Sequence, residues 1–142
     1  MTRPRRLLLP RTAPRTDARA VLGRAGETAV AAHYEGLGFR VLARNLRTTF
    51  GELDLVVHRR SWLTGSLLVA VEVKTRTHHP APERLVDEVE LQRRAVALAA
   101  IARRLLPSLR RLRLRVDIAA VTRGPDTAFE IRLFVGQPRP AR

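Results

Sequence analysis

Two neighbouring segments, residues 52–58 and 67–76, constrain the fold most, because apolar side chains recur at every second position in both. This spacing predicts two β-strands, which the short connection around Gly65 joins as an antiparallel hairpin. The charged residues that then face each other are Asp54 with Glu72 and Glu52 with Lys74. The other side carries only aliphatic residues: Leu53, Leu55, Val57, Val69, Val71 and Val73. We therefore predict a hairpin with one core face and a second face that becomes ionic away from the loop.

The remaining patterns predict an α/β fold of the α+β type, a mixed central sheet flanked by helices. We expect a helix over about 20–37, strands over about 39–45, 52–58 and 67–76, a helix over about 83–106, and strands over about 112–122 and 128–135. This α-β-β-β-α-β-β order forms a single domain over residues 20–136. A disordered basic tail over residues 1–19 and a short basic tail over 137–142 are expected on either side.

Composition narrows the environment and the partners. The chain has no cysteine, which excludes disulfides and thiolate zinc sites and fits the cytoplasm. No run of eighteen apolar residues is present, so no membrane-spanning helix is expected. The net charge of +14 favours a polyanionic partner, with DNA preferred over RNA, although a nucleotide bias that inflates arginine would give the same charge.

The facing carboxylates carry the strongest chemical signal. Side chains directly opposed in a sheet lie roughly 5 Å apart at Cβ, and two ionised carboxylates at that distance repel by about 3 kcal/mol at an effective dielectric constant of 20. A proton, Lys74 or a metal ion must offset this repulsion. A divalent ion, Mg²⁺ or Mn²⁺, does so best, with Asp54, Glu72 and the Val73 carbonyl as its oxygen ligands. Such an ion polarises both a water molecule and a phosphate, as phosphodiester hydrolysis requires.

Lys74 is the single lysine beside twenty-six arginines, which indicates that this position needs a lysine. It follows Glu72 by two residues, so both side chains lie on one strand face, where an ammonium orients the attacking water or stabilises the transition state. Glu27, in a mostly apolar helical setting, is the third expected carboxylate of the metal site. The alternative to a metal site is an ordinary ionic cluster on a solvated sheet face. Glu52 is expected to be a structural partner of Lys74 or of a helix amide, or else another site acid.

The basic and aromatic residues outside the acid pair have either a nucleic-acid-binding or a structural interpretation. Arg76, Arg93 and Arg94 are expected to contact nucleic acid, while a solvated helix face is the alternative for the arginines of the second helix. Trp62, in the hairpin loop, either stacks on a base or caps the apolar end of the sheet. Asp117, two residues after Arg115 on one strand, is expected to form an ion pair with it.

Four ordered motifs then resemble the YraN family of small, mostly bacterial proteins, which is similar to archaeal Holliday-junction resolvases in the restriction-endonuclease-like superfamily. The motifs are Gly26-Glu27, Arg44-Asn45-Leu46-Arg47, Gly51-Glu52-Leu53-Asp54-Leu55 and Val71-Glu72-Val73-Lys74-Thr75-Arg76. The resemblance covers about residues 23–135 and implies a nuclease site of Glu27, Asp54, Glu72 and Lys74. The family usually has a lysine early in the long helix, where Arg93 stands in this chain.

We therefore expect a metal-dependent endonuclease that acts on DNA, on branched or damaged forms, and that forms a homodimer as a resolvase does. A catalytically silent nucleic-acid-binding module of nuclease ancestry is the second hypothesis. The third is a structural partner protein whose charge reflects composition alone.

Overall fold

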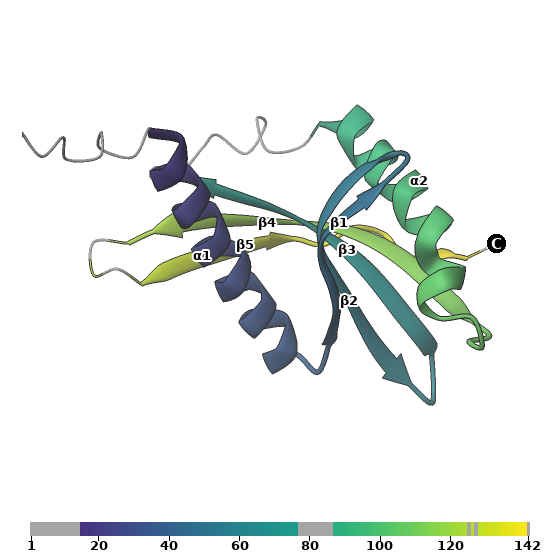
Figure 1. The fold of residues 1–142 in the computed structure, drawn as a ribbon. Helices are drawn as coiled ribbons and strands as arrows, with labels where there is room; N and C mark the ends of the chain where they lie inside the picture. Colours follow the sequence, from purple (N-terminus) through teal and green to yellow (C-terminus); the bar gives the residue numbers. More distant parts are fainter. Residues whose placement is uncertain (1–14, 77–86, 125, 127, 142) are drawn as a thin grey trace, which may run out of the picture.

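The computed structural model describes residues 15–76, 87–124, 126 and 128–141. The helices are α1 (Arg15–Gly36) and α2 (Glu88–Leu105), and the strands are β1 (Arg40–Thr48), β2 (Gly51–Ser61), β3 (Gly65–Arg76), β4 (Leu112–Arg123), β5 (Phe129–Phe134) and β6 (Arg139–Pro140). One six-stranded sheet has the order β1-β2-β3-β4-β5, and β6 pairs with β4. The β3–β4 pair is parallel and the other pairs are antiparallel, so the expected mixed sheet flanked by helices is confirmed (Figure 1).

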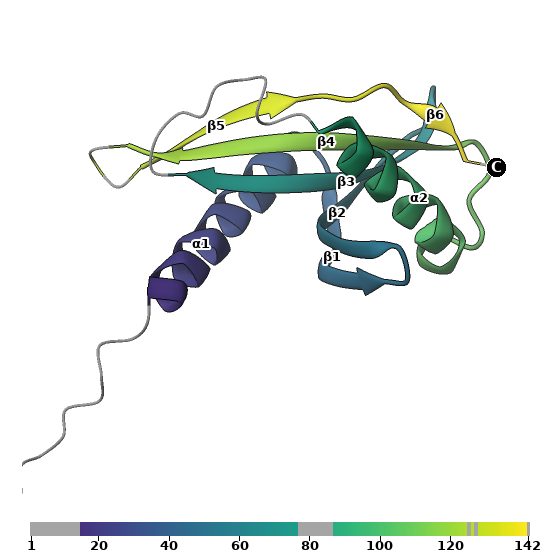
Figure 2. The same cartoon turned by 90° about the horizontal axis from the view of Figure 1, so that it is seen from above.

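The two helices build separate cores, and in Figure 2 the β1–β2 ribbon passes between them. One core contains Val30, Ala31 and Tyr34 of α1, and the other contains Ala97, Leu98 and Ala102 of α2. Alternate residues of β2 and β3 serve the two cores: Leu55, Val57, Val69 and Val71 pack with α1, while Val56, Leu68 and Ala70 pack with α2. The middle of β2 and of β3 is therefore apolar on both faces, and the charged residues of these two strands lie to either side of it.

The predicted register of β2 and β3 is confirmed from Ser61 opposite Gly65 to Leu55 opposite Val71. Beyond Leu55, β2 continues to pair with β1 as far as Gly51. The β1–β2 hairpin thereby curls toward α2. Leu53 consequently packs in the α2 core and not, as expected, with Leu55 on the α1 side.

The element ends differ from the sequence-based bounds. Helix α1 begins at Arg15, inside the segment expected to be a basic tail, and β6 lies within the expected C-terminal tail. Helix α2 begins after Asp87, whose carboxylate accepts the N–H groups of Val89 at 3.0 Å and Glu90 at 3.3 Å, a regular N-cap. Its expected start near residue 83 falls outside the described residues. Neither helix in the described part is long and apolar enough to cross a membrane.

Candidate functional site

Asp54 and Glu72 meet where β2 and β3 separate. The Val73 N–H donates to Asp54 Oδ2 at 2.9 Å, so the Asp54 side chain bridges the two strands beyond the last ladder pair. Burial raises the pKa of Asp54. Burial, followed by the charge of Asp54, raises the pKa of Glu72 to about 7. The two carboxylates thus share one partly buried place in which full ionisation of both is unfavourable.

Arg94, on α2, is the cation that contacts this pair directly. Its Nε donates to Glu72 Oε2 at 2.9 Å and its Nη2 to Glu90 Oε1 at 3.4 Å, with 18% of the side chain exposed. Burial lowers the pKa of Arg94, but the bond to Glu72 and the surrounding acids outweigh it and raise the pKa overall. Arg93, the next residue, is exposed. The two neighbouring arginines therefore occupy different environments, and only Arg94 faces the acids.

Lys74 also points to α2. Its Nζ lies 3.3 Å from Glu90 Oε2, and 17% of its side chain is exposed. The expected pairing of Lys74 with Glu52 is wrong: Glu52 instead lies opposite Arg47 of β1, with the charged atoms 3.9 Å apart. The cause is the departure of β2 from β3, which carries Glu52 away with the β1–β2 hairpin.

Glu27 approaches the acid pair from α1. The helix packs closely on β3 because residue 26 is glycine; a Cβ there would collide with the Thr75 side chain. Asn45 Nδ2 donates to Glu27 Oε2 at 3.3 Å from a backbone with a φ of 48°. Burial raises the pKa of Glu27, and the charge of Asp54 raises it further. Glu27 is thus electrostatically linked to Asp54, while its hydrogen-bond partner is Asn45.

Two contributors to the site were not expected from the sequence. Glu90 holds both Lys74 and Arg94, and its spacing of four residues from Arg94 on α2 was the available signal. Asn45 is the other, and its place in the Arg44–Arg47 motif was the signal. Arg76 lies exposed at the end of β3, two residues beyond Lys74, and its contact with nucleic acid stays a prediction.

The donor set suits a hard divalent ion. Among the described residues, no three His, Cys, Asp or Glu side chains converge closely enough to hold a metal ion by themselves. Mg²⁺, however, is usually bound by one or two carboxylates and completes its shell with water and substrate phosphate. Burial is the main cause of the raised pKa values of Asp54 and Glu72, and a bound cation would favour the ionised form of both carboxylates. The residues present therefore fit Mg²⁺ or Mn²⁺.

A second buried carboxylate, Asp117 of β4, lies against α1 on the other face of the sheet. It accepts hydrogen bonds from Arg115 at 2.8 Å to each oxygen, from the Tyr34 hydroxyl at 2.7 Å and from the Gly136 N–H at 3.0 Å. The expected ion pair with Arg115 is confirmed. Burial and the Asp117 charge raise the pKa of Tyr34 and keep its proton in place as a donor.

This chain is similar in sequence to one protein family and to individual proteins from several organisms. A profile of the uncharacterised protein family UPF0102 matches residues 26–121. A UPF0102 protein of Syntrophotalea carbinolica is 39% identical over 85% of this chain and 94% of its own length, and one of Anaeromyxobacter dehalogenans is 41% identical over 87% and 91%. A relative from Mycolicibacterium gilvum is 51% identical, and the match spans 44% of this chain and about half (49%) of that relative. The chain belongs to the uncharacterised protein family UPF0102, the YraN family.

Proposed function

We propose that the protein is a metal-dependent nuclease that hydrolyses phosphodiester bonds in DNA. The observation that carries this proposal is the Asp54–Glu72 pair, two carboxylates with raised pKa values beside a partly buried lysine. Acids whose pKa values are shifted by burial and by each other, gathered beside a cation, occur often at catalytic sites, although structural ion-pair networks shift pKa values as well. Membership of the UPF0102 family adds no assigned activity.

Asp54 and Glu72 would hold Mg²⁺ or Mn²⁺, with the Val73 carbonyl as a neutral ligand and Glu27 as a further carboxylate acting directly or through water. The bound ion would supply Lewis-acid activation of a water molecule and neutralise charge on the phosphate. Lys74 is placed to orient the attacking water or to stabilise the charge that develops on the phosphate oxygens. Its ammonium would exchange Glu90 for these groups, a small movement of a flexible side chain.

Arginines would bind the rest of the phosphate backbone. Arg94 can transfer from Glu72 to a phosphate when the acid pair gains another cation, and Arg76 and Arg93 are exposed nearby on β3 and α2. Phosphate contacts of this kind position DNA without reading its sequence. Branched or damaged DNA is the substrate form we expect. The homodimer and the cytoplasmic location remain predictions.

One observation favours a second function, a catalytically silent nucleic-acid-binding module. Both cations of the site are already paired, Lys74 with Glu90 and Arg94 with Glu72 and Glu90. A stable ionic network of this kind would neutralise the acids without a metal. The two functions differ in whether the network opens when DNA and a divalent ion are present.

The decisive experiment incubates the full chain with linear, nicked, flapped and four-way DNA and with RNA, in Mg²⁺, in Mn²⁺ or in chelator. We expect metal-dependent cleavage of at least one DNA form. Lys74→Arg keeps the positive charge and should lose cleavage while retaining DNA binding, because a planar guanidinium does not replace a compact ammonium. Binding without cleavage of any substrate would favour the silent module, and cleavage by Lys74→Arg at the wild-type rate would remove Lys74 from the mechanism.

A further inference from the structure

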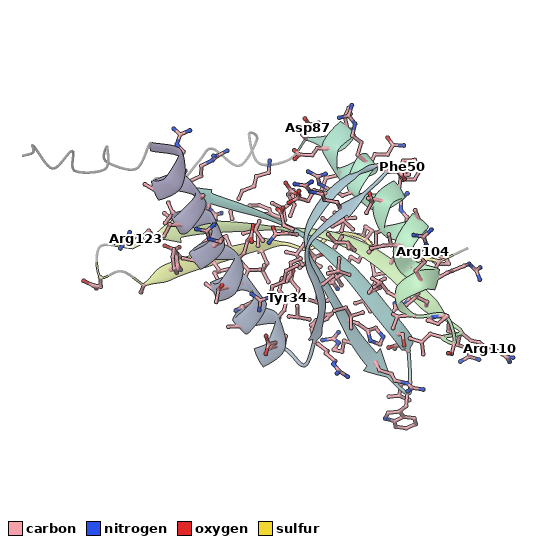
Figure 3. The ribbon with its side chains drawn as sticks, viewed as in Figure 1. Tyr34, Phe50, Asp87, Arg104, Arg110 and Arg123 are labelled. Carbon is pink, nitrogen blue, oxygen red and sulfur yellow. The ribbon has the colours of Figure 1, made fainter. Side chains whose placement is uncertain are left out.

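Three exposed apolar side chains surround one hollow beside the acid site. Phe50, at the turn between β1 and β2, is 50% exposed, and Val89 and Val96 of α2 are 61% and 44% exposed. They line a hollow of about 460 Å³ together with Thr49, Gln92 and Arg93. Figure 3 shows Phe50 at the hairpin turn next to α2. An exposed aromatic ring that faces an apolar helix surface across an open hollow needs an explanation in terms of what it binds.

The hollow adjoins the proposed catalytic residues. Gly51 follows Phe50, and a Cβ on Gly51 would lie 2.9 Å from Arg94 Nη1, so the Arg94 guanidinium packs against the hairpin turn. The same guanidinium holds Glu72. One turn of α2 thus carries Arg93 at the hollow and Arg94 at the acid pair.

We propose that this hollow receives the base of an unpaired nucleotide next to the phosphodiester bond at the acid pair. This inference rests on the proposed nuclease function and deepens it, because it defines the substrate class as DNA with an unpaired nucleotide. Phe50 supplies a stacking surface, Val89 and Val96 an apolar wall, and Gln92 an amide that can hydrogen-bond a base edge. In a paired duplex the base is stacked inside the helix and cannot enter such a hollow.

Charge favours a nucleotide over a peptide or a second copy of this chain. The described residues that line the hollow include one arginine and no carboxylate, and Arg94 lies behind them. A larger groove of about 570 Å³ between α2 and the C-terminal segment makes the contrast clear. Its lining combines the carboxylate of Glu88 with Arg115 and Arg139 and, among the described residues, includes no aromatic ring. Of these two hollows, the one at Phe50 has both an aromatic surface and, in Arg93, an exposed arginine with no carboxylate among its described lining residues, as a base and its phosphate require.

The test measures the affinity of the full chain for two DNA molecules that differ only in pairing. One is a duplex with a single unpaired 2-aminopurine, and the other is the same sequence fully paired, both in chelator so that no cleavage occurs. Stacking on an aromatic side chain contributes about 1–3 kcal/mol per base, so we expect roughly tenfold tighter binding of the unpaired form and quenching of its fluorescence. Phe50→Ala should abolish both effects, while Phe50→Tyr should keep them.

Trp62→Ala is the matched control. Trp62 is 91% exposed, so it does not cap the core. It lies at the opposite end of β2 from Phe50 and is therefore unable to stack on the base that the hollow receives, so its removal should leave the preference for the unpaired form unchanged. Val96→Glu is a second variant, at an exposed helix position. It should weaken the binding of the unpaired DNA and leave the binding of the paired DNA unchanged. An unchanged preference in Phe50→Ala would overturn the inference. So would a wild-type dimer in sedimentation that Phe50→Ala converts to monomer, because the hollow would then be an interface.

The outcomes also separate this inference from the nuclease proposal. Equal binding of both DNA molecules, with metal-dependent cleavage that Asp54→Asn abolishes, would reject the base site and retain the nuclease. Failure to bind either DNA, together with no metal-dependent cleavage of any substrate, would reject both.

Discussion

Two carboxylate clusters on opposite faces of the same sheet differ in how completely their charge is satisfied. Asp117 receives four hydrogen bonds, from Arg115, Tyr34 and Gly136, and is fully buried. Asp54 and Glu72 lie beside each other with raised pKa values, although Arg94 and a backbone N–H already bond to them. Burial is therefore common to both clusters, and the number of donors around each negative charge is what separates them.

The difference indicates two roles. Asp117 joins α1, β4 and the segment after β5, because its partners come from all three, and such a network fixes the packing of elements distant in sequence. Burial raises the pKa values of Asp54 and Glu72, so ionising both carboxylates costs stability. Under the proposed function a bound cation would offset this cost, and such a cost is usual at a functional site.

The largest expected effect is on stability, in Asp117→Asn. An amide offers one acceptor oxygen where four donated hydrogen bonds now end, and it leaves Arg115 without its counter-charge. We expect a loss of about 3–5 kcal/mol in the free energy of unfolding, measured by urea denaturation with circular dichroism. Asp126→Asn, at an exposed turn position, is the control and should change stability little. A loss below 1 kcal/mol in Asp117→Asn would contradict the structural role.

Asp54→Asn should lower activity and not stability, in contrast to Asp117→Asn. The amide oxygen can still accept the Val73 N–H, and the removal of one charge relieves repulsion with Glu72, so stability should be unchanged or raised. Cleavage should fall at least about a hundredfold, because electrostatic stabilisation of that size depends on a single ligand or donor. Calorimetric titration with Mn²⁺ should show a site in the wild type that the variant lacks. If Asp54→Asn is strongly destabilised, Asp54 has a structural role like that of Asp117.

The pH dependence of stability should distinguish the clusters next. The pKa of Glu72 is about 7 in the folded protein against an ordinary value of 4.5, so the folded state binds this proton more tightly than the unfolded chain. Its stabilising contribution is therefore complete below pH 4.5 and is lost as the pH rises through 7. Glu72→Gln should remove this loss and exceed the wild type above pH 7 by roughly 1–2 kcal/mol, after allowance for solvent screening.

Urea denaturation at pH 5 and pH 8 measures this difference. The two proteins should be closer in stability at pH 5 than at pH 8. If the wild type instead becomes more stable relative to Glu72→Gln as the pH rises, then Glu72 has a lowered pKa and the acid pair is fully neutralised.

The smallest effect should come from Arg94→Gln, compared with Arg93→Gln. Arg94 donates to Glu72, so its removal leaves the acid pair more negative and should tighten Mn²⁺ binding about fivefold, or roughly 1 kcal/mol. The titration belongs at pH 8.5, where Glu72 is ionised. Arg93 is exposed and should leave the metal affinity unchanged. Weaker Mn²⁺ binding in Arg94→Gln would mean that Arg94 holds Glu72 in its binding position and does not compete with the ion.

Local patterns allowed much of this fold to be predicted. Alternation in β2 and β3 gave their register from Ser61 to Leu55, and helical spacing located both helices. The position of Asp54 beside Glu72 followed from that register, although its hydrogen bond to Val73 did not. The short strand β6 was missed because two residues carry no periodicity that distinguishes a strand from a tail.

The errors have one physical origin. Alternation assumes that a strand keeps the same neighbours along its length, but β2 loses β3 beyond Leu55 and stays paired with β1 alone. That separation moved Leu53 into the α2 core and parted Glu52 from Lys74. The inclusion of Arg94 and Glu90 in the site depended on the angle at which α2 docks, which no local spacing specifies.

The sequence by itself determined that an aspartate, a glutamate and a lysine would gather at one end of a central hairpin, because the two-residue period of a strand fixes which side chains share a face. The tertiary structure decided which charges meet there. The bend of the β1–β2 hairpin and the docking of α2 brought Arg94 and Glu90 to the acids and opened the hollow at Phe50. Such contacts join residues far apart in the chain, so their geometry follows from the packing of whole elements rather than from the order of neighbouring residues.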